Sequence, residues 1–426
     1  MIIVDVAAGD PMPEPHTIEI DPQVLAGARR IIDRVRREGD EALVELTAFH
    51  DGVDIRGGIG VPRHRWNRAA ERVRPEVRTA LDRMANRLRE LHARQLPRPW
   101  SDTRDGVRFG EVIRPLRSVG CYVPGGRAAY PSSVLMTVVP ARVAGVERVV
   151  VCTPPGRDGF VPDAVLYAAS VAGADAVYRV GGTHAVAALA YGTESIPRVD
   201  KVVGPGNVWV TAAKRELAGV VGVDGLAGPT ELVIVADGSS DPAMLAVDLV
   251  AQAEHDPGAT ATLVALERRL ADSLPPAVRR ETEASPRREI VGRSIESARL
   301  VLVPDVAAAA EVVERLAPEH LQVATADPGA FLDRVRSFGA AFLGPLTPVS
   351  FGDYGVGSNH VLPTMGTARF ASGLRATDFV TVSSFAETSE EGLHVFGQEV
   401  EAVAESEGLP GHARASRSRR TMGGRP

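Results

Sequence analysis

Apolar residues recur at spacings of three and four positions between Pro22 and Gln95. Two long stretches carry this pattern, VLAGARRIIDRVRREGDEALVELTAFHDG and WNRAAERVRPEVRTALDRMANRLRELHARQ. The spacing puts apolar side chains on one face of a helix, so it predicts amphipathic helices in this region. The next stretch, RFGEVIRPLRSVGCYVPGG, predicts strands that end on a glycine-rich turn.

Further along the chain, short apolar runs alternate with helical windows. RVVVCTPP precedes DAVLYAASVAGA, VDKVVGPG precedes NVWVTAAKRELAG, and ELVIVAD precedes a helical window that ends in QAEH. Alternation of this kind predicts parallel sheets covered by helices, and the number of units is large for one sheet. We therefore predict an α/β fold with two Rossmann-like parallel-sheet domains, a helical N-terminal region and a C-terminal extension.

The predicted domain boundaries follow these changes of pattern. Residues 1–21 form an N-terminal segment. Residues 22–121 and 230–375 form the first Rossmann-like domain, which is discontinuous, and residues 122–229 form the second. Residues 376–426 leave the strand–helix alternation for one long amphipathic helix, so they are predicted to be a separate C-terminal segment.

Composition restricts the class of protein. The 426 residues are 44% hydrophobic, which is ample for buried cores in a globular protein. A net charge of −6 argues against nucleic-acid binding over the whole chain, although the end HARASRSRRTMGGRP is locally basic. No apolar run has the length of a membrane span, and the N-terminus lacks a signal-peptide pattern. The expected compartment is the cytoplasm.

Cysteine and lysine are both scarce. Cys121 and Cys152 are too few for a thiolate cluster or a disulfide framework, so a metal would need His, Asp, Glu or Gln ligands. Cys121 could be a nucleophile, but a cysteine buried in a strand is the favoured interpretation. Lys201 and Lys214 are the only lysines, and no G-K-[ST] phosphate loop is present.

The stretch AVDLVAQAEHDPGATATLVAL contains a candidate metal site. Gln252 and His255 are three residues apart, so on a helix they would share a face and could hold one ion. The polar end of an ordinary surface helix explains the same residues. The spacing alone leaves both interpretations open.

Three other polar clusters could carry chemistry. In each, a carboxylate and a histidine come close together in sequence, and such groups can act as acids and bases. The pairs are Glu319 and His320 in LAPEHLQVA, Asp353 and His360 in SFGDYGVGSNHVLPT, and Glu407 and His412 in ESEGLPGHA. A solvated helix end or a polar loop accounts equally well for each pair taken alone.

Glycine-rich turns suggest a ligand site at sheet edges. Ligands of open α/β sheets bind at the carboxyl ends of strands, where we place YVPGG (122–126), VGGTH (180–184), VGPGNVWV (203–210) and LAGPTE (226–231). The helix expected after Asn207 could bind phosphate at its N-terminus. None of these turns is a G-x-G-x-x-G motif, and each could simply be a tight turn.

Taken together, six motifs make a family resemblance visible. They are YVPGGRAAYPSSVLM, GPGNVWVTAAKRE, AGPTE, DLVAQAEHDP, PEHL and GDYGVGSNHVLPT, and in this order they closely resemble the histidinol dehydrogenase family. The resemblance extends over nearly the whole chain, as far as His412. It implies a homodimer with one zinc ion in each active site. It also implies two successive NAD-dependent oxidations of L-histidinol, through the aldehyde, to L-histidine.

The resemblance also implies roles for individual residues. The zinc ligands would be Gln252, His255, Asp353 and His412. His320 would remove the substrate's hydroxyl proton, and Glu319 would activate the water that hydrates the aldehyde. Substrate contacts would come from Thr230, His360 and Glu407 in addition to the zinc ligands and His320. The NAD site, in residues 122–229, would be lined by Tyr122, His184 and Asn207. The C-terminal segment of one subunit would complete the active site of the other.

Two positions depart from the family pattern. Thr230 stands where serine is common, which keeps the hydroxyl group. His184 stands where the family usually has glutamine, so a ring that can protonate near neutral pH would replace a neutral amide beside NAD.

Three other functions are compatible with parts of the pattern. A paralogous zinc- and NAD-dependent dehydrogenase could oxidise another alcohol, such as a sulfonated propanediol, to an acid. A zinc hydrolase could use Glu319 to activate water without a nicotinamide cofactor. A non-catalytic α/β protein could bind a ligand at the same turns. Glu407 favours histidinol among the alcohols, because a carboxylate suits a cationic substrate amine.

Overall fold

The computed structural model describes residues 1–426 except 16, 18, 126–127 and 423–426. The chain divides into two compact units, and each is described by itself. The first unit comprises Met1–Gln95 and Leu116–Phe379, and the second comprises Leu96–Pro115 and Val380–Pro426. No helix among the described residues is long and apolar enough to cross a membrane.

The first unit contains a six-stranded, wholly parallel sheet. Its strand order is β1(Ile2–Asp5), β11(Arg299–Leu302), β10(Thr260–Ala265), β9(Glu231–Ala236), β12(His320–Ala324) and β13(Ala340–Leu343). The helices that follow these strands are α9(Pro242–Ala253), α10(Arg268–Ala284), α11(Arg288–Ser297), α12(Val306–Leu316), α13(Pro328–Leu332) and α14(Val349–Asp353). Strand β1 lies within the predicted N-terminal segment 1–21 and is an edge strand of this sheet.

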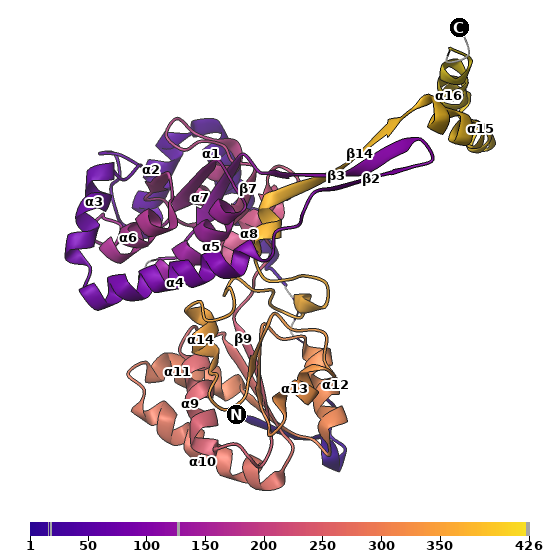
Figure 1. Cartoon of the computed structure of the whole chain (residues 1–426). Helices are drawn as coiled ribbons and strands as arrows, with labels where there is room; N and C mark the ends of the chain where they lie inside the picture. Colours follow the sequence, from indigo (N-terminus) through magenta and orange to yellow (C-terminus); the bar gives the residue numbers. More distant parts are fainter. Residues whose placement is uncertain (16, 18, 126–127, 423–426) are drawn as a thin grey trace. The chain divides into compact units, whose positions relative to one another are not determined.

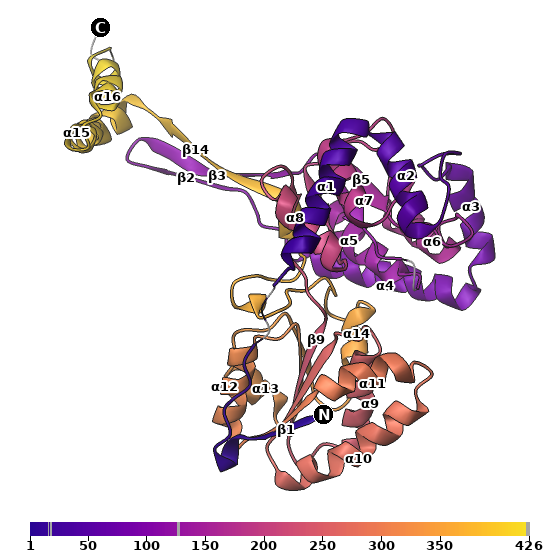
Figure 2. The same ribbon diagram turned by 180° about the vertical axis from the view of Figure 1, so that it is seen from behind.

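Side-chain alternation buries both faces of this sheet. Leu232 and Ile234 of β9 belong to one core cluster together with side chains of α9 and α10. Val233 and Val235 of the same strand belong to another cluster with side chains of α12. Successive side chains of a strand point to opposite faces, so an unbroken apolar run fits a sheet covered on both sides. Figures 1 and 2 show α9, α10 and α11 on one side of β9 and α12 and α13 on the other.

A second parallel sheet of five strands lies in the same unit. Its order is β6(Ala176–Tyr178), β5(Arg148–Cys152), β4(Ser118–Tyr122), β7(Lys201–Val203) and β8(Gly222–Val223). The helices in this part of the chain are α5(Pro131–Val143), α6(Asp163–Ala172), α7(Gly182–Tyr191) and α8(Val208–Leu217). Cys121 and Cys152 are free thiols buried in adjacent strands, and burial raises the pKa of Cys121 to about 12. This confirms the structural interpretation of Cys121.

The N-terminal helices pack against the second sheet's helices, which differs from the predicted domain boundaries. These helices are α1(Pro22–Glu38), α2(Asp40–Asp51), α3(Arg63–Arg72) and α4(Pro75–Ala93). Helix α1 packs on α7 and α8, α3 on α6, and α4 on α5 and α6. The reason is the apolar stripe itself, because Ile32, Val35 and Leu43 share one core cluster with Ala187 and Leu189. Helices α1 to α4 therefore pack with residues 122–229 rather than with 230–375, and residues 96–115 belong to the second unit.

The second unit is built from two distant parts of the chain. Strands β2(Trp100–Arg104), β3(Val107–Pro115) and β14(Val380–Thr388) form an antiparallel sheet in the order β14-β3-β2. Helices α15(Glu390–Ser406) and α16(Pro410–Met422) follow and pack on each other. The predicted single long helix is thus a strand and two helices, because the chain turns at Gly408 with a φ of +70°. The described residues also include three short 3-10 helices, Val6–Ala8, Thr367–Arg369 and Ala376–Phe379.

Candidate active site

The acid–base pair lies at the amino edge of the six-stranded sheet. Helix α12 ends at Leu316, Ala317 adopts a left-handed conformation with φ 46°, and the chain enters β12 at His320. In the neighbouring strand β9, Thr230 directly precedes the first residue, so LAGPTE lies at the amino end and not at the predicted carboxyl end. Helix α9 ends at Ala253, and His255 lies in the turn after it. Gln252 is therefore in the last turn of the helix, and His255 is beyond it.

Thr230 links Glu319 to Gln252. The Thr230 hydroxyl donates to Oε2 of Glu319 at 2.6 Å, and Nε2 of Gln252 donates to the hydroxyl oxygen at 2.8 Å. Because the hydroxyl proton is directed to the carboxylate, the hydroxyl oxygen can only accept from Gln252. This orients the amide of Gln252 and leaves its Oε1 as the atom that could bind a cation.

Glu319 is a buried carboxyl group with a raised pKa. Burial raises the pKa to about 7, while the hydrogen bonds from Thr230 and from the backbone N–H of Glu231 act in the opposite direction. A carboxyl group that titrates near neutral pH can both accept and return a proton. Glu319 therefore suits general acid–base work.

The tautomer of His320 follows from its backbone contact. Nδ1 lies 3.2 Å from the carbonyl oxygen of Glu231, and a carbonyl can only accept, so Nδ1 carries the proton of the neutral ring. Nε2 then has a free lone pair, and it lies 3.9 Å from Oδ1 of Asp353. Burial lowers the pKa of His320 and keeps the ring neutral. Nε2 is thus available as a base.

Asp353 brings the second histidine into the cluster. Its Oδ2 lies 3.9 Å from Nε2 of His255, whose side chain is 48% exposed. Nδ1 of His360 donates to the Asp353 carbonyl at 3.0 Å, while Nε2 of His360 lies 3.2 Å from the Ser133 hydroxyl. Burial lowers the pKa of His360 as well.

The residues present fit a zinc ion in part. Zinc binds nitrogen and oxygen ligands at about 2.0–2.2 Å, and one ion can contact both His255 and Asp353 across their 3.9 Å separation. Gln252 adds an oriented amide oxygen close to Thr230. Within the described ranges, no three His, Cys, Asp or Glu side chains form a group that could hold a metal. The set in the first unit therefore needs a further donor.

Glu407 and His412 belong to the second unit. Glu407 is the C-cap residue of α15, and His412 lies in the first turn of α16. Both side chains are exposed. The structure thus brings together Thr230, Gln252, His255, Glu319, His320, Asp353 and His360, whereas Glu407 and His412 are separate from this cluster in the division of the chain.

The predicted cofactor residues lie around the second sheet. Tyr122 ends β4, and its buried hydroxyl accepts from the N–H of Gly182 at the start of α7. Asn207 is the N-cap of α8, with its side-chain oxygen accepting from the N–H groups of Trp209 and Val210. Gly126, part of the predicted YVPGG turn, lies outside the described residues.

His184 differs from what the sequence suggested. Its ring is 2% exposed, and Nε2 lies 3.3 Å from the Thr47 hydroxyl of α2. The ring also stacks on His50, with ring centroids 6.0 Å apart. Burial and, secondarily, the nearby His50 lower the pKa of His184 to about 3. The ring is therefore neutral near pH 7, and the charge that the sequence suggested at this position does not arise.

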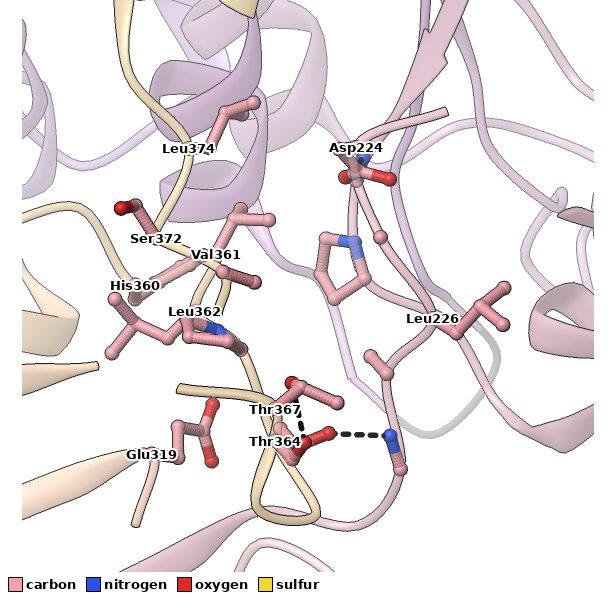
Figure 3. A pocket seen from close by; sticks show the side chains of 18 of the residues that line it. Asp224, Leu226, Glu319, His360, Val361, Leu362, Thr364, Thr367, Ser372 and Leu374 are labelled. Atoms are coloured by element: carbon pink, nitrogen blue, oxygen red, sulfur yellow. Dashed lines mark hydrogen bonds between the residues drawn. The ribbon is translucent and has the colours of Figure 1, made fainter. Parts of the chain in front are cut away.

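A cavity is lined by part of the acid–base cluster and by the turn that precedes Asn207. It has a volume of about 340 Å³ and is lined by the turn Gly204–Gly206, by Thr230 and Glu319, and by the loop that begins at His360. Figure 3 shows Glu319 and Asp224 on opposite sides of this pocket. On its wall the N–H of Gly228 donates a 2.7 Å hydrogen bond to the hydroxyl oxygen of Thr364. Asp224 and Lys214 also line it. The sequence pattern gave neither residue a role, because neither stands in a cluster of chemical groups along the chain.

Comparison with known proteins decides the family. The model of the family described as histidinol dehydrogenase matches residues 16–420. The chain is 47% identical over 404 residues to a histidinol dehydrogenase of Methanothermobacter thermautotrophicus, covering 94% of each chain. It is 46% identical over 408 residues to one of Rhizobium meliloti, covering 95% of this chain and 94% of the other.

The chain belongs to the histidinol dehydrogenase family. A crystal structure of histidinol dehydrogenase from Elizabethkingia anophelis has the same fold, with a TM-score of 0.93 at 30% identity, and the match covers 99% of this chain and 98% of that one. Histidinol dehydrogenases are NAD-dependent oxidoreductases of histidine biosynthesis, so the hydrolase and the non-catalytic binding protein no longer apply. The predicted fold class and family are both confirmed.

Proposed function

We propose that this chain oxidises L-histidinol twice, through histidinal, to L-histidine, with NAD as the oxidant and a bound zinc ion. The observation that carries the proposal is the geometry around His320. Its free Nε2 lies 3.9 Å from Oδ1 of Asp353, whose Oδ2 lies 3.9 Å from Nε2 of His255, and its Nδ1 lies 3.5 Å from the carboxyl group of Glu319. Two proton-transfer groups beside a nitrogen and oxygen ligand set match a reaction that removes protons from an alcohol and then from an aldehyde hydrate.

Each step has a place for its protons. In the first oxidation Nε2 of His320 accepts the hydroxyl proton while the carbinol carbon loses a hydride, which gives the aldehyde. The Glu319 carboxylate then takes a proton from water as the water adds to the aldehyde, and the protonated His320 gives its proton to the carbonyl oxygen, which forms the hydrate and leaves His320 neutral again. Glu319 afterwards releases its proton to solvent. In the second oxidation His320 accepts a hydroxyl proton of the hydrate, and the carboxylic acid forms. Over the two oxidations the substrate loses two hydrides and gains one oxygen atom from water.

The cofactor and the metal ion would supply the chemistry that the side chains do not. When bound, NAD would supply the acceptor for the hydride in each oxidation, and zinc would supply a positive centre for the substrate's imidazole and amine. Gln252, His255 and Asp353 would hold the ion, with His412 of the partner subunit as the fourth ligand. Thr230 and His360 would contact the substrate from the same subunit, and Glu407 of the partner subunit would pair with its amine. Tyr122, His184 and Asn207 would form the NAD side of the site.

The exposed position of His412 supports a homodimer with shared sites. Both Glu407 and His412 have exposed side chains in a unit that is separate from Gln252, His255 and Asp353. A symmetric dimer would let each C-terminal segment serve the other subunit. The two free buried thiols, Cys121 and Cys152, support the cytoplasm as the working compartment, because it keeps thiols reduced.

A substrate panel tests the proposed reaction. Purified protein with zinc and NAD is given histidinol, histidinal, a sulfonated propanediol and simple amino alcohols, and NADH formation is followed. We expect two NADH per histidinol and the highest kcat/KM with histidinol. The double variant Glu319→Gln/His320→Asn serves as the control for contaminating dehydrogenases. A higher kcat/KM for the sulfonated diol would assign the chain to the alternative alcohol.

A further inference from the structure

A buried ion pair lies beside the cavity and plays no part in the proton transfers. Lys214 of α8 and Asp224, which follows β8, are 2.5 Å apart from Nζ to Oδ1. Their side chains are only 4% and 6% exposed. Lys214 is one of two lysines in a chain whose other basic side chains are nearly all arginine. Both partners line the 340 Å³ cavity.

The pair holds both polar groups of one residue, Gly204. Nζ of Lys214 donates to the Gly204 carbonyl at 2.5 Å, and the Gly204 N–H donates to Oδ2 of Asp224 at 2.6 Å. Gly204 is buried, so its N–H and carbonyl would otherwise lose their hydrogen bonds to water without replacement. The ion pair thus fixes the turn from both sides.

The backbone at Gly204 has no room for a side chain. Its φ is +119°, and an added Cβ would lie 2.0 Å from the Tyr122 carbonyl oxygen. The turn therefore passes directly against the end of β4, where Tyr122 lies. Asn207, the N-cap of α8, begins three residues later. One ion pair consequently sets the position of the turn that joins two of the residues proposed to bind NAD.

Stability alone does not explain such a pair. Replacing a buried ion pair by apolar residues of similar volume is often neutral or stabilising, because desolvation offsets the attraction between the charges. What the pair provides is a fixed geometry at Gly204, with the charged groups anchored on α8 and on the loop after β8. A single conformation of the Gly204–Pro205–Gly206 turn fixes part of the lining of the cavity, which Glu319 also lines. Asp224, which holds this turn, lies across the cavity from Glu319 (Figure 3).

We propose that Lys214 and Asp224 are positioning residues for the dinucleotide, which hold the Gly204–Gly206 turn in the conformation that NAD binds. This inference rests on the proposed placement of NAD at Tyr122 and Asn207. The residues act through the turn and not on the reacting atoms. Loss of the pair should therefore weaken NAD binding and leave the chemical steps largely intact.

The test replaces the pair as a unit. Lys214→Met/Asp224→Leu removes both charges together and avoids an unpaired buried charge, which would itself destabilise the fold. Lys214→Met/Asp224→Asn keeps an amide oxygen that can accept from the Gly204 N–H. One of the two hydrogen bonds that hold Gly204 is thereby restored. The matched control is Lys201→Met, which removes the other lysine and its 2.8 Å hydrogen bond to the Asp378 carbonyl. Lys201 does not line the cavity.

The readouts separate positioning from folding. For each variant we measure the melting temperature, zinc content, the Kd for NAD by calorimetry, and kcat and KM for both substrates. We expect Lys214→Met/Asp224→Leu to raise the Kd and KM for NAD at least about tenfold, with kcat and KM for histidinol within about threefold of the wild type. The Asn-containing variant should recover part of the loss, and Lys201→Met should show none.

Other results would overturn the inference. A folded Lys214→Met/Asp224→Leu protein with wild-type affinity for NAD contradicts it directly. So does an equal loss of NAD, zinc and histidinol binding, which would show a general structural role. If Asn207→Ala leaves NAD affinity unchanged as well, the cofactor placement itself is wrong. If Asn207→Ala weakens NAD binding and the pair variant does not, only the positioning role is lost.

Discussion

The hydroxyl group of Thr230 donates a hydrogen bond of 2.6 Å to the carboxylate of Glu319. The contact explains why threonine is acceptable where the family commonly has serine, since the hydroxyl is the part that acts. It also favours the ionised form of Glu319 and so opposes the effect of burial on its pKa.

Thr230→Val should shift the pH dependence of aldehyde hydration. Without the hydroxyl the pKa of Glu319 rises above about 7, so the carboxylate needed as base forms only at higher pH. The acid limb of the rate with histidinal should move to higher pH, whereas Thr230→Ser should keep the wild-type profile. An unshifted limb in Thr230→Val would remove Thr230 from this role.

The two members of the acid–base pair should be separable by substrate. His320→Asn removes the base for both oxidations, so rates with histidinol and histidinal should fall together, by on the order of 10²–10⁴-fold. Glu319→Gln should mainly impair the hydration that precedes the second oxidation. Single-turnover NADH formation with each substrate measures the difference. Equal losses with both substrates in both variants would contradict the division.

Removal of the metal should abolish turnover but spare cofactor binding. The proposed ligands Gln252, His255 and Asp353 belong to the first sheet's elements, while Tyr122 and Asn207 belong to the second. We expect chelated, metal-free protein to lose activity and to bind NAD with nearly unchanged Kd, and added zinc should restore turnover. A normal histidinol oxidation rate in protein shown to be metal-free would refute the role of the metal.

Glu231 provides a prediction for stability. Burial raises its pKa to about 7 in the folded protein, against an ordinary value of 4.5. The folded state therefore binds the proton more tightly, and the stability that this gives is lost as the pH rises from about 4.5 to about 7. Glu231→Gln keeps an oxygen to accept the 2.7 Å bond from the Met365 N–H and carries no charge.

Urea unfolding over this pH range checks the sign. Relative to the wild type, the Glu231→Gln protein should become more stable with rising pH, by on the order of 2 kcal/mol at pH 8. Glu314→Gln is the matched control, because backbone and Ser337 hydrogen bonds lower the pKa of Glu314 and the expected effect has the opposite sign. The same pH trend in both variants would show that burial of Glu231 is not the cause.

Mixed dimers test the shared site. His412→Ala and His320→Ala proteins are each expected to be inactive, because each site then lacks a ligand or the base. After joint unfolding and refolding, a mixed dimer in the shared arrangement has one site with both lesions and one with neither. Activity of about a quarter of the wild type should then return for random pairing. If each C-terminal segment served its own subunit, mixed dimers confirmed by mass would stay inactive.

Local sequence patterns predicted the parts of the fold that depend on neighbours in the chain. The alternation of apolar runs and helical windows predicted two parallel sheets, and the QAEH stretch does lie at the end of α9. The side on which α1 packs was not predictable, because its apolar stripe of Ile32 and Val35 fits any apolar surface. The sheet edge of AGPTE was assigned wrongly, since the chain crosses from one sheet to the other just before Thr230.

Contacts between residues far apart in the chain were the least predictable from the sequence. The tautomer of His320 depends on its contact with the carbonyl of Glu231, and the Lys214–Asp224 pair holds Gly204. The spacing of these residues along the chain predicts neither contact. The family motifs supplied the candidate site residues, whereas the hydrogen bonds that orient them came only from the structure.

The pairing of β14 with β3 has a consequence for biosynthesis. Arg108 and Glu387 are partners in this ladder, although 279 positions separate them. At ribosomal speeds of about 5–20 residues per second, β3 waits on the order of 15–60 s for its partner to be made. During this interval the β2–β3 hairpin presents an open strand edge, which is a site where newly made chains can associate incorrectly. The second unit can therefore assemble only after residues 380–388 have been made.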